Sequence, residues 1–270
     1  MSSSSKRRII MRNRATLIEA LERYRRKFLK QEKAERYFSE RVLMAWVFHD
    51  NLLEGRTFRP EEIQIALRHQ DQQLPSYLRP LLEDVRRYEQ AIEMTCVWAQ
   101  EGLSSFNLSN LQELHRHLMF HEPQEGARLR RNSPVHRDYQ QVICNHRQVS
   151  TRLQQFFIEA LNFNIQTDDV LSYAAHLHHQ LMHIYPYRRQ PGALARLFTN
   201  QFLIMHGYPP IILASHERGT YYEALAAHNC ASLAQLFYQA AWRYLDSIDS
   251  EQVVKKKLSF STPHQQAQIG

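Results

Sequence analysis

The chain has 270 residues, of which 43% are apolar and only seven are glycine. This length allows one large domain or two small ones with a substantial core, and the composition favours helices. The three cysteines are odd in number and far apart in the sequence, so they indicate neither a disulfide framework nor a metal-binding pair. A reducing compartment fits them best, and we therefore expect a cytoplasmic protein.

The formal net charge of +7 raises the question of a nucleic-acid or acidic partner. Much of this net charge lies in residues 1–14 and 247–270, which we interpret as solvated, disordered tails. The chain has no apolar run long enough to span a bilayer, and its first residues lack the hydrophobic region of a signal peptide. We therefore expect no membrane association.

Apolar residues recur at helical spacing along most of the chain. Asn107 or Ser109 is a suitable N-cap for one of these helices. A basic segment, residues 126–149, separates the helices of the first half from those of the second. In chain order, helices are predicted over residues 16–38, 39–53, 61–69, 78–99, 107–117, 149–162, 170–183, 194–207, 221–227 and 232–245.

The segment between the helices 170–183 and 194–207 is a short loop broken by Pro186 and Pro191. It leads into the N-terminus of a helix, whose first amides lack partners within the helix and point outward. Such a terminus is suited to binding phosphate groups. We therefore expect this loop to be the functional centre of the chain.

Residues 185–196 of this loop have the sequence Tyr-Pro-Tyr-Arg-Arg-Gln-Pro-Gly-Ala-Leu-Ala-Arg. This stretch resembles the signature loop of Fic proteins, His-Pro-Phe-x-Asp/Glu-Gly-Asn-Gly-Arg-x-x-Arg, enzymes that mostly transfer AMP from ATP to a target hydroxyl. The resemblance implies an all-α, Fic/Fido-type helical bundle with a short β-hairpin flap. It places an N-terminal helical region at residues 15–100 and a Fic-like core at residues 101–246, between the two tails.

The loop departs from the family pattern at the positions that carry the chemistry. Tyr185 replaces the histidine that is the family's general base, and a phenol with an ordinary pKa of about 10 is a poor base at neutral pH. Arg189 replaces the acidic residue that holds magnesium, and a cation cannot ligate a metal. The family's Gly-Asn-Gly turn becomes Gln-Pro-Gly, ending at Gly192, and its first arginine becomes Ala193, which leaves only Arg196. We therefore predict no intact catalytic group, no magnesium site and no cofactor, with ATP as an open alternative.

A second motif lies at the end of the helix 39–53. Glu54 and Gly55 match the motif Ser/Thr-x-x-x-Glu-Gly/Asn of Fic relatives in which a preceding helix plugs the nucleotide site, whereas Asp50 replaces the Ser or Thr. The resemblance implies that Glu54 pairs with the second arginine of the loop motif, Arg196. The pair has an inhibitory role in those relatives, and the need to keep a buried charge paired also explains its presence.

The basic segment 126–149 occupies the place of the family's flap, which pairs with the backbone of a target as an added strand. Arg137, Val142 and Ile143 are the candidate target-binding residues. We weigh an exposed, solvated loop against a surface for an acidic or phosphorylated partner. Tyr221 and Tyr222 are candidates for stacking on a nucleotide base, although packing between helices explains them equally well.

Four histidines in the helix 170–183 raise the question of a metal site, since His179 and His183 have the spacing of zinc ligands. No glutamate lies between them, and the resemblance accounts for histidines in this helix, so we predict no metal site.

The preferred hypothesis is a catalytically inactive Fic-fold protein that binds a protein partner through the flap and the remodelled pocket. A second hypothesis is a transferase of altered chemistry, in which Tyr185 is the acid or acceptor and Arg188, Arg189 and Arg196 hold phosphates in place of magnesium. A third is a nucleic-acid-binding protein that uses the tails and the basic segment.

Overall fold

The computed structural model describes residues 3–30, 38–68, 76–133, 143–166, 168–227 and 229–260, with only the backbone of residues 3–13, 77 and 249–260. These described residues form helices and contain no strand, which confirms the all-α class. The hairpin is predicted within residues 126–149. Residues 126–133 and 143–149 contain no strand, and residues 134–142 lie outside the described part of the chain.

Ten α-helices are described, joined by short connections and 3₁₀ turns. The helices are α1 (Ser3–Lys30), α2 (Glu40–Leu53), α3 (Pro60–Leu67), α4 (Arg79–Glu101), α5 (Leu108–Leu118), α6 (Val149–Ala160), α7 (Val170–Ile184), α8 (Pro191–Met205), α9 (Arg218–Ala226) and α10 (Ala231–Phe260). The 3₁₀ turns are η3 (Ser76–Leu78), η4 (Leu103–Ser105), η5 (Pro123–Glu125), η6 (His146–Gln148) and η7 (Ser215–Glu217).

Polar residues at the predicted positions begin several of these helices. The Ser39 hydroxyl accepts from the amide of Val42 at the start of α2. The side-chain Oδ1 atom of Asn107 accepts a hydrogen bond from the backbone amide of Asn110 at the start of α5. Asn107, and not Ser109, is therefore the cap of this helix. Each side chain satisfies an amide that has no partner within its helix.

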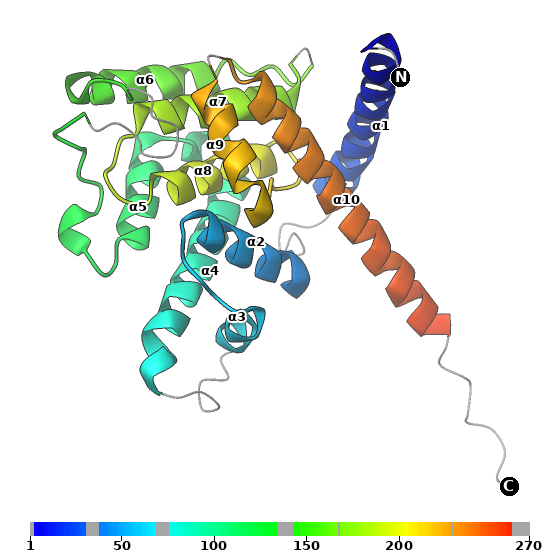
Figure 1. Ribbon diagram of the computed structural model, residues 1–270, viewed down its shortest axis with the longest axis horizontal. Coiled ribbons are helices and arrows are strands. Elements are labelled where there is room, and N and C mark those ends of the chain that lie inside the picture. The colour runs from blue at the N-terminus through cyan, green and yellow to red at the C-terminus, as the bar shows by residue number, and fades with distance from the viewer. Residues whose placement is uncertain are drawn as a thin grey trace, which may run out of the picture.

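Helix α8 lies at the centre of the bundle, packed against α4 and α7 (Figure 1). Every residue from 192 to 204 is buried, including the polar Asn200 and Gln201. A helix covered on all sides cannot show the one-sided apolar pattern of a surface helix. The aromatic ring of Phe106 stacks on Phe198 of α8 with a centroid separation of 4.3 Å, so the segment before α5 also packs against α8.

The first and last helices, α1 and α10, pack against each other beside this bundle, and α10 continues beyond it (Figure 1). The rings of Tyr24 and Tyr244 meet edge to face at 5.8 Å. Helix α1 begins at Ser3 and α10 runs to Phe260, so the structure differs from the expectation of disordered tails over residues 3–14 and 247–260. These stretches are rich in helix-favouring residues and continue helices that packing has already nucleated.

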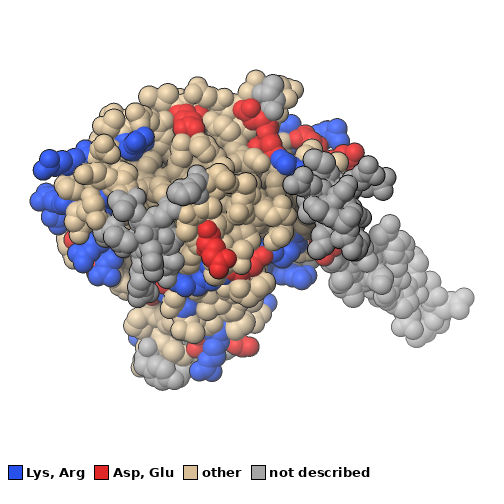
Figure 2. Space-filling model, turned by 45° about the horizontal axis from the view of Figure 1, so that its top comes forward, with Lys and Arg blue, Asp and Glu red and all other residues tan. Residues whose placement is uncertain are grey.

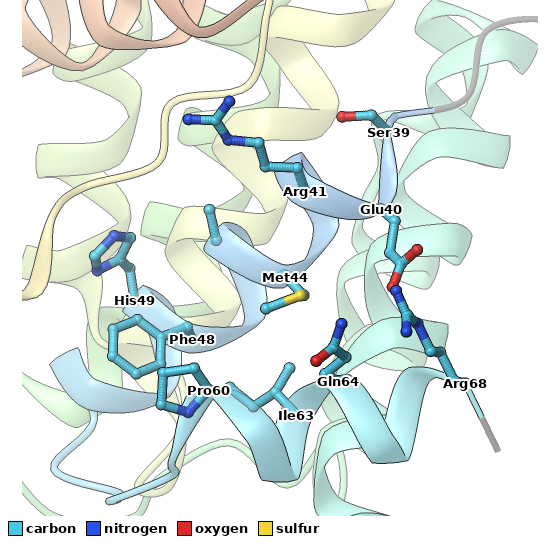
Figure 3. Close-up of a pocket in the computed structure, with 11 residues that line it drawn as sticks. Ser39, Glu40, Arg41, Met44, Phe48, His49, Pro60, Ile63, Gln64 and Arg68 are labelled. Atoms are coloured by element: carbon cyan, nitrogen blue, oxygen red, sulfur yellow. The ribbon is translucent and has the colours of Figure 1, made fainter. Parts of the chain in front are cut away.

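Helices α2 and α3 enclose a hollow of about 700 Å³ away from the loop (Figure 3). Its floor is apolar, with Met44 and Phe48 of α2 facing Pro60 and Ile63 of α3.

Within the described part of the chain, no helix combines the length and the apolar character needed to cross a bilayer.

Candidate functional site

The loop between α7 and α8 is held in an unusual backbone conformation. Tyr185, which ends α7, and Gln190, which precedes α8, both lie in the left-handed region, with φ of 49° and 54°. Residues other than glycine adopt this region only when the surrounding structure enforces it. Helix α8 begins at Pro191, three residues before the predicted start, because proline suits the first position of a helix.

Arg130 enforces the conformation at the α7 end of the loop. Its side chain is buried and donates hydrogen bonds to the carbonyl oxygens of Ile184 (3.1 Å), Tyr185 (2.7 Å), Asn132 and Cys144. The last carbonyls of a helix have no partner within the helix, and a cation is favoured there. Arg130 thus joins the segment after α5 to the end of α7.

His115 of α5 holds the other side of the same loop. The amide of Ala127 donates to its Nδ1 atom (2.9 Å), so the ring proton lies on Nε2 and is donated to the carbonyl of Arg189 (3.1 Å). The ring also stacks on Tyr187, with centroids 3.9 Å apart. Burial lowers the pKa of His115 to about 4, so the ring is neutral at pH 7.

Arg196, in the second turn of α8, lies in a buried cluster with two carboxylates of α2. Its Nη2 atom donates to Oε1 of Glu54 at 2.8 Å, so the predicted contact between these two residues is present. Its Nε atom donates to Oδ1 of Asp50 at 3.0 Å, and the hydroxyl of Tyr88 donates to Oδ2 of the same carboxylate. The Nη1 atom is buried without a hydrogen-bond partner among the described residues. We call Asp50, Glu54, Tyr88 and Arg196 the acidic clamp.

The two carboxylates of the acidic clamp lie at different depths. The side chain of Asp50 is 1% exposed, whereas that of Glu54 is 18% exposed. Burial raises the pKa of Asp50, against the attraction of Arg196. Burial also acts to lower the pKa of Arg196, but Asp50 and Glu54 outweigh it and raise that pKa well above its usual value. The guanidinium therefore stays charged between the two acidic groups.

In the sequence, Asp50 is only a departure from a motif, without an assigned role. The available signal was its spacing: Asp50 and Glu54 are four residues apart at the end of α2, which places both on one face of the helix. His115 and Arg130 carried no comparable signal.

Glu54 lies directly against the first turn of α8. A Cβ atom added to Gly192 would lie 2.4 Å from Oε1 of Glu54, so only glycine allows this close approach. A helix N-terminus attracts negative charge, and here a carboxylate of the protein itself occupies that position.

The stretch that contains the loop also matches a known family. Residues 105–203 match the sequence model of the Fic/DOC family. Residues 105–203 are a Fic/DOC-family domain. The proteins named "Protein adenylyltransferase Fic" of Drosophila erecta and Drosophila persimilis are each 32% identical to this chain over 128 residues, which is 45% of this chain and 24% of theirs. The match thus spans about a quarter of the length of these relatives.

Solved structures show that the likeness in fold extends beyond the Fic domain. Fic-1 of C. elegans (residues 134–508) superposes with a TM-score of 0.70 over 94% of this chain and 76% of that chain, at 18% identity. A Fic family protein of Desulfovibrio desulfuricans G20 gives a TM-score of 0.70 over 90% of this chain and 74% of that one, also at 18% identity. The fold of the Fic domain and of the helices around it is therefore shared.

The remaining loop residues of the Fic domain do not converge on Arg196. Arg188 and Arg189 are exposed, and Arg189 lies 3.5 Å from Glu122. Ala193 is fully buried in α8 and Tyr185 is half-buried. A hollow of about 320 Å³ leads from the surface to Glu54, with Arg56, Glu122 and Arg189 on its walls.

The structure also locates the other candidates in or beside the Fic domain. Tyr221 and Tyr222 of α9 are buried, and Tyr221 is hydrogen-bonded to Nε2 of His178 at 2.9 Å. These rings pack between helices, and their stacking on a nucleotide base stays a prediction. Among the flap candidates, Ile143 is 1% exposed, so its side chain faces the core. Arg137 and Val142 lie outside the described residues.

The two histidines with zinc-like spacing are engaged in other contacts. His179 and His183 stack at 4.1 Å, with Nε2 of His179 against the carbonyl of Ala227 and Nδ1 of His183 against the carbonyl of His179. In the part of the chain that the structure describes, no group of three or more His, Cys, Asp or Glu side chains is placed to hold a metal ion.

Proposed function

We propose that this Fic-domain protein acts by binding a partner and does not transfer AMP. The observation that carries the proposal is the acidic clamp. Arg196, which takes the place of the family's second motif arginine, is held between Asp50 and Glu54 and is almost fully buried. Two carboxylates more than offset one guanidinium, so this position disfavours a phosphate.

The substitutions around the loop support the same conclusion. Tyr185 stands at the position of the general base, and a protonated phenol does not accept the proton of a target hydroxyl. Arg189 lies 3.5 Å from Glu122, and Ala193 offers no charged group. An enzyme that lost only its base would keep its nucleotide site, whereas here base, metal ligand and phosphate ligand are all replaced.

The residues present do not fit a magnesium–nucleotide complex. The position nearest the first turn of α8 is taken by Glu54, whose carboxylate would repel a phosphate. The Glu54 side chain borders the 320 Å³ hollow and has space to turn away from α8. Asp50 would still neutralise Arg196 after such a movement. The acidic clamp therefore offers no suitable position for the phosphates of ATP.

The test is a comparison of the wild type with Glu54→Gly and with the double variant Asp50→Ser/Glu54→Gly, and with Glu101→Gly as the control for a new glycine at a helix end. Each protein is incubated with ATP and Mg²⁺ and analysed by intact mass, and ATP binding is followed by calorimetry. We expect no AMP adduct in any protein, and ATP binding only in the double variant. An AMP adduct on the wild type or on Glu54→Gly would overturn the proposal. ATP binding by Glu54→Gly alone would show that Asp50 does not close the site.

A further inference from the structure

A second buried arginine of the Fic domain is surrounded by a different kind of partner. The guanidinium of Arg130 donates to the carbonyl oxygens of Asn132, Cys144, Ile184 and Tyr185, and its residue is 6% exposed. Among the described residues, no carboxylate pairs with it. Carbonyl oxygens satisfy its donors but do not cancel its charge, so a positive potential persists around it.

A hollow of about 260 Å³ opens beside this buried charge. Arg131 and Arg188 on its walls are exposed, and neither has an acidic partner among the described residues. Arg128 lies 3.5 Å from Glu125, the one acidic residue of the lining. We call this site, lined by Glu125, Arg128, Leu129, Arg130, Arg131, Asn132 and Arg188, the arginine hollow.

The surface charge agrees with this arrangement. Figure 2 shows Lys and Arg side chains gathered at the left side of the molecule, the side on which Figure 1 places the segment that follows α5. The wall of the hollow is also fixed in place, because the amide of Arg130 donates to the carbonyl of Pro186 at 3.0 Å, in addition to the contacts of the Arg130 side chain. A ligand therefore meets arginines on a wall whose backbone is already ordered.

We propose that the arginine hollow binds a phosphorylated side chain of a partner protein. A phosphomonoester carries close to two negative charges at pH 7 and offers three acceptor oxygens, which suits guanidinium groups that donate in pairs. This inference rests on the proposed function, since it specifies the chemistry of the partner that the protein binds. Arg188 then takes part in this site and not in a nucleotide site.

A single phosphate suits the site better than a nucleic-acid backbone does. The hollow is local, and Glu125 lies on its wall beside Arg128, where it would repel the neighbouring phosphates of a continuous strand. A nucleic-acid surface instead extends as a basic stripe that neutralises several phosphates in a row.

The experiment titrates the full chain with the peptide acetyl-Gly-Gly-phosphoserine-Gly-Gly-amide, with its unphosphorylated form and with a 15-nucleotide poly(dT) strand. The wild type is compared with Arg131→Gln/Arg188→Gln and with the control Arg79→Gln/Arg152→Gln, which removes two exposed arginines elsewhere. Circular dichroism checks that each variant is folded. We expect saturable binding of the phosphopeptide alone, weakened about tenfold or more by the hollow variant and unchanged by the control.

Three results would overturn this inference. They are no saturable binding of the phosphopeptide by the wild type, equal affinity in the two double variants, and preferred binding of poly(dT) that is lost in the hollow variant. The last would assign the hollow to a nucleic-acid backbone. The mass measurement of AMP transfer is independent, so an AMP adduct would overturn the proposed function whatever the peptide does.

Discussion

The two buried arginines at the ends of the loop between α7 and α8 show how the same side chain takes opposite electrostatic roles. Arg196 donates to the carboxylates of Asp50 and Glu54, whereas the described partners of the Arg130 side chain include four backbone carbonyl oxygens. Both arginines are buried and hydrogen-bonded, Arg196 more deeply than Arg130. Only the charge of Arg196 is cancelled locally.

Both arginines hold an end of the Fic loop in place, but only one end of the loop keeps a positive charge that can attract an anion. The acidic clamp joins the end of α2 to α8 and places two acidic side chains against one guanidinium at the α8 end of the loop. Arg130 keeps the other end in place and leaves positive charge beside an open hollow. An intact loop framework is therefore compatible with an anion site at a new position, and substitutions at the two arginines should have different consequences.

The largest expected effect is that of Arg196→Met. The change leaves two carboxylates, one of them fully buried, without their counter-charge, and we expect the free energy of unfolding to fall by about 3 to 5 kcal/mol. Urea unfolding measures this value. The control is Arg68→Met, since Arg68 forms an exposed pair with Glu40 and its loss should cost about 1 kcal/mol or less. Equal costs for the two variants would contradict the acidic clamp.

Arg130→Met should be less destabilising, because it strands no charge. It removes charge-assisted hydrogen bonds to the end of α7, which we expect to lower the free energy of unfolding by about 2 to 3 kcal/mol. The exposed neighbour Arg131→Met is the matched control and should change stability little. A loss as large as that of Arg196→Met would mean that Arg130 has an acidic partner, and the comparison of the two sites would fail.

His115 should make the stability of the loop depend on pH. Its pKa is lowered by burial to about 4 in the folded protein, from an ordinary value of 6.5. Its contribution is therefore present above pH 6.5 and is lost as the pH falls toward 4. Between pH 7 and pH 5, the free energy of unfolding should fall by about 2 kcal/mol more in the wild type than in His115→Gln. Parallel pH profiles for the two proteins would show that His115 is not held neutral in the fold.

The smallest effect is expected for Glu54→Gln. Glu54 is the more exposed carboxylate of the acidic clamp, and Asp50 continues to neutralise Arg196 when it is replaced. We expect a loss of about 1 kcal/mol or less, measured by the same urea unfolding. A loss close to that of Arg196→Met would mean that Glu54, and not Asp50, supplies the main counter-charge.

Much of the fold follows from local patterns. The apolar spacing places the helices, and the caps at Ser39 and Asn107 mark where two of them begin. The ends of α1 and α10 were not foreseen, since they extend past the apolar stripe on which the prediction relied. The resemblance of the loop implied the contact between Glu54 and Arg196, which the structure contains. The inhibitory role of that contact stays a prediction.

The sequence by itself determined the helical class, the order of the helices and the position of the loop, because helix periodicity and caps depend on residues a few positions apart. Only the tertiary structure decided which arginine charge is cancelled. Asp50 and Arg196 are 146 residues apart, and Arg130 and Tyr185 are 55 apart, so their contacts depend on how the helices pack. A carboxylate partner cancels the positive electric field of a buried arginine, whereas carbonyl partners leave a positive field. Neither kind of partner leaves a periodic pattern in the sequence.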